Sequence, residues 1–127
     1  MEKKRLALLG CGKLNHIVAD AYLNGILSEY AVVGVLGRTK EKAEVLAEKL
    51  GCERCENIDE LMALKPDYVA EAASVAAVKS YAEAVLAGGA NLVVISIGAF
   101  ADEAFLEQVK MTAKAHGTRV YIASGAV

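Results

Sequence analysis

Tryptophan is absent from this 127-residue sequence, proline occurs once, and aromatic residues make up only 6% of the chain. Hydrophobic residues nevertheless reach 55%, with many alanines and valines among them. This composition fits closely packed helices on a parallel sheet better than an antiparallel sandwich. A chain of this length is expected to form one domain and is large enough for a single continuous core.

Neither sign of charge dominates, because the formal net charge is only −2 at pH 7. The chain therefore lacks the basic field that nucleic-acid binding requires, and we predict no nucleic-acid partner. No apolar run reaches the roughly 18 residues that cross a bilayer. The charged start of the sequence is followed by only about five apolar residues, too few for a signal peptide. These absences predict a cytoplasmic protein with no membrane partner.

Cysteine is also scarce, and the three cysteines suit a reducing compartment. Cys52 and Cys55 have C-x-x-C spacing, which raises a redox pair or half of a zinc site as alternatives. No tryptophan or proline lies beside them, and His16 and His116 are far away in the sequence. We therefore interpret residues 52–55 as part of a short edge strand after a helix, and predict no metal site.

A glycine pair follows the first buried strand. Residues 5–9 form an apolar run without a helical period, which is typical of a strand buried on both faces. Gly10-Cys11-Gly12 comes next and leads directly into a helical pattern. The positions that define the buried face of this helix are Leu14, Ile17, Val18, Ala21, Tyr22 and Gly25. Strand, tight glycine turn and helix together hold a dinucleotide pyrophosphate in doubly wound sheets.

Each glycine has a separate expected role in this loop. Gly10 allows the sharp turn, and Gly12 lets the backbone come close to the phosphates, where the first N–H groups of the helix face the anion. The expected contacts to the cofactor in this loop are Gly10, Gly12, Lys13 and Leu14. Asn15 stands where the full motif has a third glycine, so we expect a slightly displaced helix or a reshaped loop.

Strands and helices alternate along the rest of the chain without a linker or repeat. Strands are predicted at residues 5–9, 30–36, 53–56, 68–70, 91–96 and 118–123. Thr39, Asn57, Ser74 and Asp102 are predicted to begin the intervening helices as N-caps. The pattern predicts a Rossmann-type doubly wound α/β fold, with six parallel strands in the order 3-2-1-4-5-6 and helices on both faces.

The end of the second strand bears on the choice of cofactor. An NAD site usually has Asp or Glu here, to hold the ribose 2′-hydroxyl. This chain instead has Gly37, then Arg38, Thr39 and Lys40, which could hold a 2′-phosphate. The alternative is an ordinary helix start with Arg38 and Lys40 in solvent. We favour NADP over NAD.

Ligands of such sheets lie beyond the carboxyl ends of the strands. The other cofactor contacts predicted on this ground are Ala72, Ala73, Ser74, Ser96, Ile97, Gly98 and Ser124. No catalytic residue is predicted, because no nucleophile, metal cluster or paired carboxylate is recognisable. His16 is interpreted as a surface or packing residue and His116 as a cap of a helix C-terminus. Glu71 ends a strand. Its side chain could face the site, or it could have a capping or packing role, and the sequence leaves both alternatives open.

Four segments together resemble the amino-terminal half of the L-aspartate dehydrogenase family. They are the loop Gly10-Cys11-Gly12, residues 66–73 with Ala77-Val78, residues 91–102, and the Ser-Gly-Ala segment at residues 124–126. The segment Ser-Ile-Gly-Ala-Phe-Ala-Asp within residues 91–102 is specific, whereas the glycine loop is shared with many dehydrogenases. The chain departs from the family at Asn15, and at Gly37 with Arg38.

The resemblance implies reversible oxidation of L-aspartate to iminoaspartate, with hydride transfer to the nicotinamide of NAD or NADP. It also implies that the acid–base histidine and most contacts to the small amino-acid substrate belong to a second domain after Val127. Residues 1–127 are then the dinucleotide-binding domain, inactive alone. A missing second domain would leave an exposed apolar patch, and a homodimer through that patch is a further expectation. Two alternatives stay open: a stand-alone nucleotide-binding or sensing module, and the cofactor half of another enzyme such as homoserine dehydrogenase or dihydrodipicolinate reductase.

Overall fold

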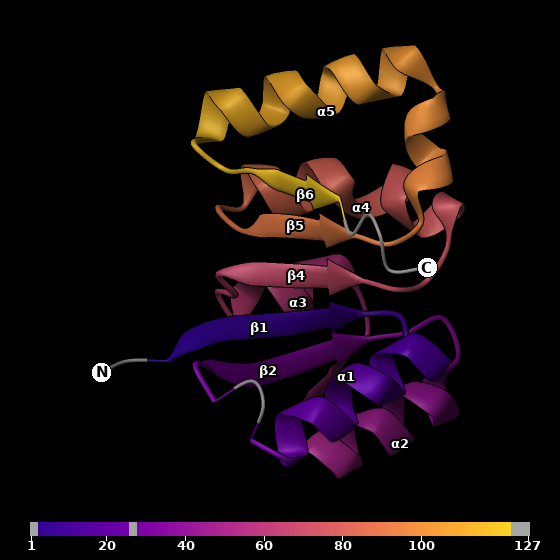
Figure 1. Cartoon of the computed structure of the whole chain (residues 1–127), viewed down its shortest axis with the longest axis vertical. Coiled ribbons are helices and arrows are strands. Elements are labelled where there is room, and N and C mark those ends of the chain that lie inside the picture. Colours follow the sequence, from indigo (N-terminus) through magenta and orange to yellow (C-terminus); the bar gives the residue numbers. More distant parts are fainter. Residues whose placement is uncertain (1–2, 26–27, 123–127) are drawn as a thin grey trace.

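A computed structural model of the chain describes residues 3–25 and 28–122. Within them, six parallel strands form one sheet in the order β3-β2-β1-β4-β5-β6 (Figure 1). The strands are β1 (Lys4–Leu9), β2 (Tyr30–Leu36), β3 (Glu53–Cys55), β4 (Tyr68–Glu71), β5 (Asn91–Val94) and β6 (Val120–Ile122). The helices are α1 (Lys13–Leu23), α2 (Lys40–Leu50), α3 (Ile58–Ala63), α4 (Val75–Ala87) and α5 (Glu103–His116), with a 3₁₀ helix η1 (Ile97–Ala101). The predicted fold class and strand order are confirmed.

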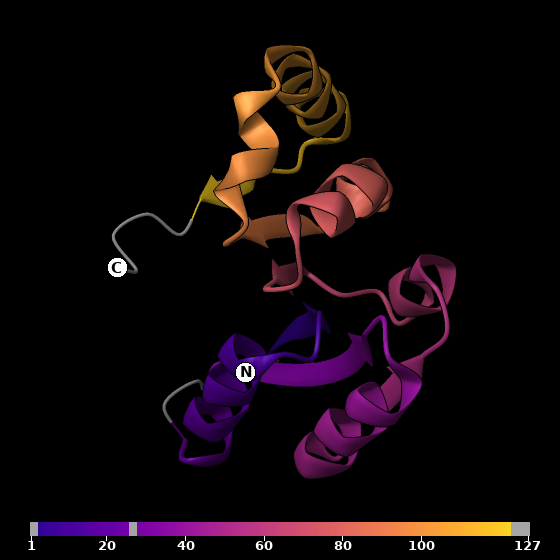
Figure 2. The ribbon, with the colours of Figure 1, turned by 90° about the vertical axis from the view of Figure 1, so that its right-hand side faces the viewer.

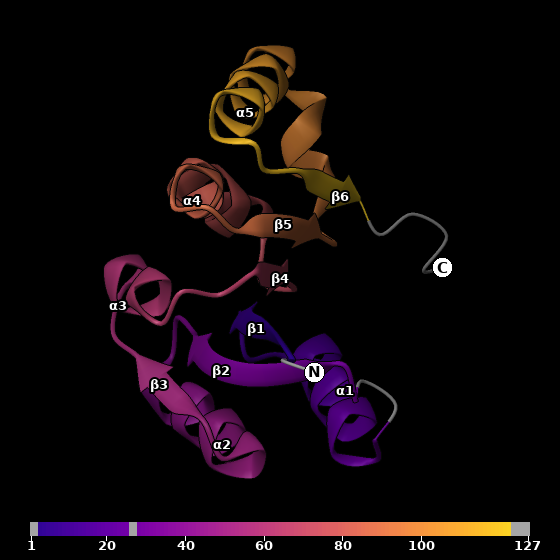
Figure 3. The same cartoon turned by 90° about the vertical axis from the view of Figure 1, so that its left-hand side faces the viewer.

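Two groups of helices cover opposite faces of the sheet (Figures 2 and 3). Helices α1 and α2 pack on β1 and β2 and enclose one core cluster. Helices α3, α4 and α5 pack on the other face and enclose the second, larger cluster. This division follows from right-handed crossovers, because the chain winds in one direction from β1 to β3 and in the other from β4 to β6. No helix of the described ranges is long and apolar enough to cross a membrane.

The buried stripe of α1 is shifted around the helix from the predicted one, and the two share Val18 and Tyr22. Asn15 and Ala19 are fully buried, and Val18 and Tyr22 pack against the same core cluster. Ile17, which was expected inside, is 55% exposed. The four inward residues have the spacing of one helix face. Because the first of them, Asn15, is polar, the pattern of apolar residues alone does not indicate this face.

Three of the four predicted N-caps are confirmed. The side-chain oxygens of Asn57, Ser74 and Asp102 each accept a hydrogen bond from the amide nitrogen three residues further on, at 2.9, 3.0 and 3.2 Å. Thr39 precedes α2 as predicted, but in the described structure its side chain makes no capping hydrogen bond. The prediction of a capping role for the Thr39 hydroxyl was therefore wrong.

Two strands are shorter than predicted. β5 ends at Val94 instead of residue 96, and the chain then enters η1, which the sequence did not indicate. β6 covers Val120–Ile122 instead of residues 118–123, of which residue 123 lies outside the described residues. The short apolar run after β5 has no helical period, so it is read as a continuation of the strand.

The C-x-x-C pair lies where an edge strand was expected. Cys55 belongs to the core cluster under α3, whereas Cys52 packs against the cluster under α1 and α2. Both cysteines are free thiols. Burial raises the pKa of the Cys52 thiol to about 11 and also raises the pKa of Cys55. The two thiols contribute to opposite cores and stay protonated at neutral pH, which supports the interpretation as an edge strand.

Candidate functional site

A cleft of about 680 Å³ lies at the carboxyl edge of the sheet, around the β1–β4 pair where the strand order reverses. Three turns line it, at residues 9–12 after β1, 36–39 after β2 and 72–74 after β4. The rest of the lining comes from the first half of α4, from Lys42 of α2 and from Glu56, which follows β3. This is the place where doubly wound sheets bind their ligands.

Gly10 is required by the close approach of two of these turns. Its φ is +104°, and a Cβ there would lie 2.9 Å from the carbonyl oxygen of Ala72 and 2.9 Å from Cα of Ala73. Any other residue at this position would be strained and would push the β1–α1 turn away from the β4–α4 turn. Gly10 therefore allows the β1–α1 turn to pack closely against the β4–α4 turn at the base of the cleft.

For Gly12, no contact within residues 3–25 and 28–122 requires glycine. Its φ of −84° and ψ of −171° suit any residue, and a Cβ there would meet no heavy atom of the described structure within 4 Å. A side chain at this position would point into open space beside the start of α1. Its absence leaves the backbone accessible to a ligand, which is the fit expected for a dinucleotide pyrophosphate.

The N-terminus of α1 is left free to bind an anion. Gly12 offers no capping side chain, and the first turn of the helix contains no acidic residue in the described chain. By contrast, Asn57, Ser74 and Asp102 cap α3, α4 and α5. Among the described side chains, none caps the first N–H groups of α1, and the helix dipole favours a negative group there.

Asn15 explains how the chain manages without the third glycine of the motif. It is fully buried, and its Nδ2 donates to the carbonyl of Gly10 at 2.6 Å and to the carbonyl of Leu9 at 3.2 Å. These bonds tie the first turn of α1 to the end of β1. Oδ1 of Asn15 is buried without a partner in the described structure.

The second turn brings basic side chains to the cleft. Arg38 and Thr39 are exposed and line it, as predicted, whereas Lys40 lies outside the lining and Lys42 takes its place. Lys42 was missed in the sequence. It follows Thr39 by three residues, the spacing that puts two side chains on the same side of a helix start, and this spacing could have revealed it.

Among the residues predicted around the third turn, Ala72, Ala73 and Ser74 line the cleft. The hydroxyl of Ser74 is engaged as the cap of α4. The cleft also extends along α4, where the sequence predicted no contacts, over Ala76, Ala77, Ser80 and Tyr81. Their inclusion depends on how the helix axis crosses the sheet, and no local sequence signal reports that angle.

Ser96 and Gly98 lie outside the lining of the cleft. The hydroxyl of Ser96 donates to Oε2 of Glu71 at 2.6 Å, and Gly98 packs close to Val75 at the start of α4. The predicted contacts Lys13, Leu14 and Ile97 lie in α1 and η1, with side chains outside the described structure. Ser124 lies outside the described residues altogether.

Glu71 connects the ends of two central strands. Its carboxylate is fully buried and also accepts from the backbone N–H groups of Ala73, Ile95 and Ser96, each at 2.9 Å. A buried carboxylate that receives four hydrogen bonds is satisfied without leaving its site. Of the two readings left open by the sequence, the geometry favours the capping and packing role.

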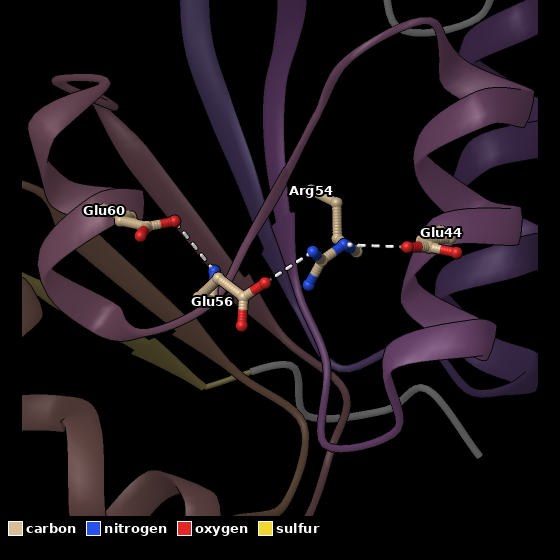
Figure 4. A network of polar contacts seen from close by, with 4 residues as sticks. All are labelled: Glu44, Arg54, Glu56 and Glu60. Atoms are coloured by element: carbon tan, nitrogen blue, oxygen red, sulfur yellow. Dashed lines mark hydrogen bonds and ion pairs between the residues drawn. The ribbon is translucent and has the colours of Figure 1, made fainter.

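An acidic side chain, Glu56 after β3, also lines the cleft. Figure 4 shows its polar contacts. Oε1 of Glu56 accepts from Nη2 of Arg54 at 2.6 Å, and Nε of Arg54 lies 3.5 Å from Glu44. The backbone N–H of Glu56 donates to Glu60 at 2.9 Å. The hydrogen bond from Arg54 lowers the pKa of the Glu56 carboxyl, so this acid is ionised and paired at neutral pH.

Neither His16 nor His116 is among the residues that line the cleft. Nδ1 of His16 is 3.3 Å from Nζ of Lys49 on α2, and that lysine also pairs with Asp20 at 2.8 Å. His116 is the last residue of α5. In the described part of the chain, no group of three His, Cys, Asp or Glu side chains could hold a metal ion.

Fold and cleft together define a Rossmann-type dinucleotide-binding domain. The family described as "Homoserine dehydrogenase, NAD binding domain" matches residues 10–123, and the chain belongs to this family of NAD-binding domains.

Curated relatives agree with the resemblance found in the sequence. The chain is 32% identical over 123 residues to the L-aspartate dehydrogenase of Methanocaldococcus jannaschii, which covers 97% of this chain and 46% of that protein. It is 51% identical over 70 residues to the L-aspartate dehydrogenase of Archaeoglobus fulgidus, covering 55% of this chain and 30% of that protein. The resemblance to the L-aspartate dehydrogenase family is confirmed. The chain spans about half the length of the relatives that match it throughout.

Solved structures show the same architecture. Aspartate dehydrogenase from Thermotoga maritima superposes with a TM-score of 0.76 at 25% identity, over 99% of this chain and 48% of that one. The WlbA dehydrogenase from Bordetella pertussis, solved in complex with NADH and UDP-GlcNAcA, has a TM-score of 0.81 at 19% identity. It covers 96% of this chain and 36% of that one, and shows the fold alone.

Proposed function

We propose that this chain is the cofactor-binding half of a dehydrogenase that oxidises L-aspartate to iminoaspartate. The support is the cleft, the family of NAD-binding domains, and relatives of about twice the length that are named L-aspartate dehydrogenases. In this proposal a catalytic domain follows residue 127 and carries the substrate contacts. The three free cysteines suit a cytoplasmic location, which is part of the same proposal.

The residues of the chain would bind and orient the cofactor. Gly12 and the first N–H groups of α1 would hold the pyrophosphate, and Arg38 with Lys42 would face the adenosine ribose. Glu71 would keep the β4 and β5 ends together beneath the cofactor. When bound, the nicotinamide supplies the hydride acceptor. We propose NADP as the preferred cofactor, because the end of β2 offers basic side chains and no acid.

Gly12 carries the proposal, since a bound ligand would explain why this residue is glycine and no contact within the described residues does. Gly12→Val is expected to abolish NAD and NADP binding in a calorimetric titration, because the added side chain fills the space beside the α1 N-terminus. Thermal unfolding should change little, since the backbone angles suit valine. Ala115→Val, an exposed change on α5, is the matched control and should bind as the unaltered chain does. Equal affinity in the Gly12 variant would contradict the site.

An uncovered sheet face supports the idea of a half-enzyme. Side chains alternate along a strand, so Val69, Leu92 and Val94 point into the core under α3–α5, and their neighbours point to the other face. No helix of the described chain covers that other face over β5 and β6 (Figure 3). Tyr121 there is 42% exposed. Parallel sheets are normally covered on both faces, so we propose that the catalytic domain packs here.

Two other assignments lead to different measurements. A homodimer through the same face would appear as concentration-dependent association of residues 1–127 in light scattering. The family name makes homoserine the second candidate substrate. Assays of the protein encoded by the entire reading frame, with L-aspartate and with L-homoserine, distinguish the two dehydrogenases.

A further inference from the structure

Gly37, at the end of β2, has no room for a side chain. A Cβ there would lie 2.6 Å from Sγ and 3.2 Å from Cβ of Cys11, and 3.1 Å from Cβ of Ala43. The φ of Gly37 is not in the positive region. Tight space, and not backbone conformation, therefore favours glycine at this position, and a larger residue would require the thiol of Cys11 to move.

Cys11 is held against Gly37 from two sides. The N–H of Gly10 donates to the carbonyl of Leu36 at 2.7 Å, which fixes the glycine loop beside the end of β2. The half-buried side chain of Cys11 packs against the core cluster under α1 and α2. Its thiol therefore occupies the volume in which a side chain of residue 37 would begin.

That volume matters for cofactor choice, because NAD sites place Asp or Glu at the end of the second strand. Cys11 excludes a carboxylate from position 37. The charged residues that line this end of the cleft are Arg38, Lys42 and Glu56, and Glu56 is already paired with Arg54 at 2.6 Å. Arg38 and Lys42 thus remain to face the ribose, which suits a 2′-phosphate.

We propose that Cys11 and Gly37 form a matched pair that determines the cofactor preference of the cleft. The thiol of Cys11 occupies the space that an acidic side chain at position 37 would need to reach the ribose. The basic side chains Arg38 and Lys42 then select the 2′-phosphorylated dinucleotide. This inference rests on the proposed function, since it specifies which dinucleotide the same site takes. The pair is coupled: an acid at position 37 is compatible with the fold only when residue 11 is smaller.

Four proteins test this coupling: the unaltered chain, Gly37→Asp, Cys11→Ala, and the double variant. Each is titrated with NAD and with NADP in a calorimeter and unfolded by heat. Gly37→Asp is expected to lower the Tm, whereas Cys11→Ala should keep the NADP preference. The double variant should regain the Tm of Cys11→Ala and shift the ratio of affinities toward NAD by about tenfold or more. Gly37→Asp with Cys52→Ala is the matched control, because Cys52 packs in the same cluster but is not among the atoms nearest Gly37.

The outcomes separate this inference from the proposed function. The proposal of a matched pair is wrong if Gly37→Asp is as stable as the unaltered chain, or if the double variant fails to fold. It is equally wrong if Cys52→Ala restores the stability of Gly37→Asp as well as Cys11→Ala does. It is also wrong if the double variant keeps the original ratio of affinities. An unaltered chain that binds neither dinucleotide contradicts the proposed function itself, while the Tm values still report whether Cys11 and Gly37 are coupled.

Discussion

Glycines at three positions of the cleft have three different causes. Gly10 is set by its backbone angle and by the approach of the β4–α4 turn, Gly37 by the thiol of Cys11, and Gly12 by nothing in the described chain. The glycine pair was recognisable in the sequence. The reason for Gly37 was not, because it depends on a contact between two turns that are 26 positions apart (37 − 11 = 26).

Asn15 shows the same limit for a buried residue. Its type predicts an exposed or capping position, and only its two hydrogen bonds to the end of β1 explain why it is fully buried. The sequence therefore predicted the helix but placed Ile17 on the wrong side of it. The local pattern predicts an amphipathic helix well. When a polar residue packs inside, however, the apolar residues alone predict the wrong buried face.

At the end of β2, Lys42 and Lys40 make a matched comparison for cofactor recognition. Arg38→Ala and Lys42→Ala are each expected to weaken NADP binding by about tenfold to a hundredfold, the value of a charge-assisted hydrogen bond. NAD affinity should change little, because NAD has no 2′-phosphate. Lys40→Ala is the control and should leave the ratio of affinities unchanged, since Lys40 lies outside the lining. A loss of NADP preference in Lys40→Ala alone would restore the assignment made from the sequence.

At the scale of elements, the sequence predicted most helix starts correctly. Asn57, Ser74 and Asp102 begin α3, α4 and α5, and Gly51 and Gly117 end α2 and α5 in left-handed conformations with φ of 69° and 67°. These signals are local, so they can be read directly from the chain. η1 has no such signal. Neither do the contacts along α4, which depend on how that helix lies over β4 and β5.

Glu71 couples two of these elements, and its substitution tests that coupling. Glu71→Gln puts a donor where backbone N–H groups of Ala73, Ile95 and Ser96 converge on the carboxylate. We expect the free energy of unfolding to fall by about 1.5–3 kcal/mol, the range for hydrogen bonds to a charged group. Chemical denaturation measures this change. Glu107→Gln, an exposed change on α5, should have almost no effect, and equal stability of both variants would show that Glu71 is dispensable.

Asp102 predicts how the start of α5 responds to pH. Its pKa is lowered, first by the hydrogen bond from the backbone of Phe105 and then by the hydrogen bond from Lys79. A carboxyl with a lowered folded-state pKa stabilises the fold above its ordinary pKa, and this contribution disappears as the pH falls through the lowered value. Asp102→Asn keeps a capping oxygen but does not titrate. The difference in Tm between the two proteins should therefore narrow on going from pH 7 to pH 2, and a constant difference would contradict the assignment.

For the whole molecule, strand order and cleft position followed from the alternation of elements. The observed order is the simplest one that right-handed crossovers give for six alternating strands, and the carboxyl ends of β1 and β4 then meet at the switch point. The same winding leaves one face of β5 and β6 without a helix of the described chain. The sequence could not predict the residues that this leaves exposed, because exposure depends on strand register.

An assay of hydride transfer tests whether a catalytic domain packs on the open face of β5 and β6. Residues 1–127 alone are expected to bind NADP but to give no steady reduction of it with L-aspartate, since hydride transfer needs a positioned substrate, a proton acceptor and exclusion of water. The protein encoded by the entire reading frame should turn over. Tyr121→Lys should remove that turnover without affecting NADP binding by residues 1–127, because a charge would then lie in the domain interface. Val45→Lys is the control: Val45 is 58% exposed on α2, away from the open face, and its substitution should leave turnover intact. Steady turnover by residues 1–127 alone would mean that the proton acceptor lies within this chain, and the half-enzyme would have to be abandoned.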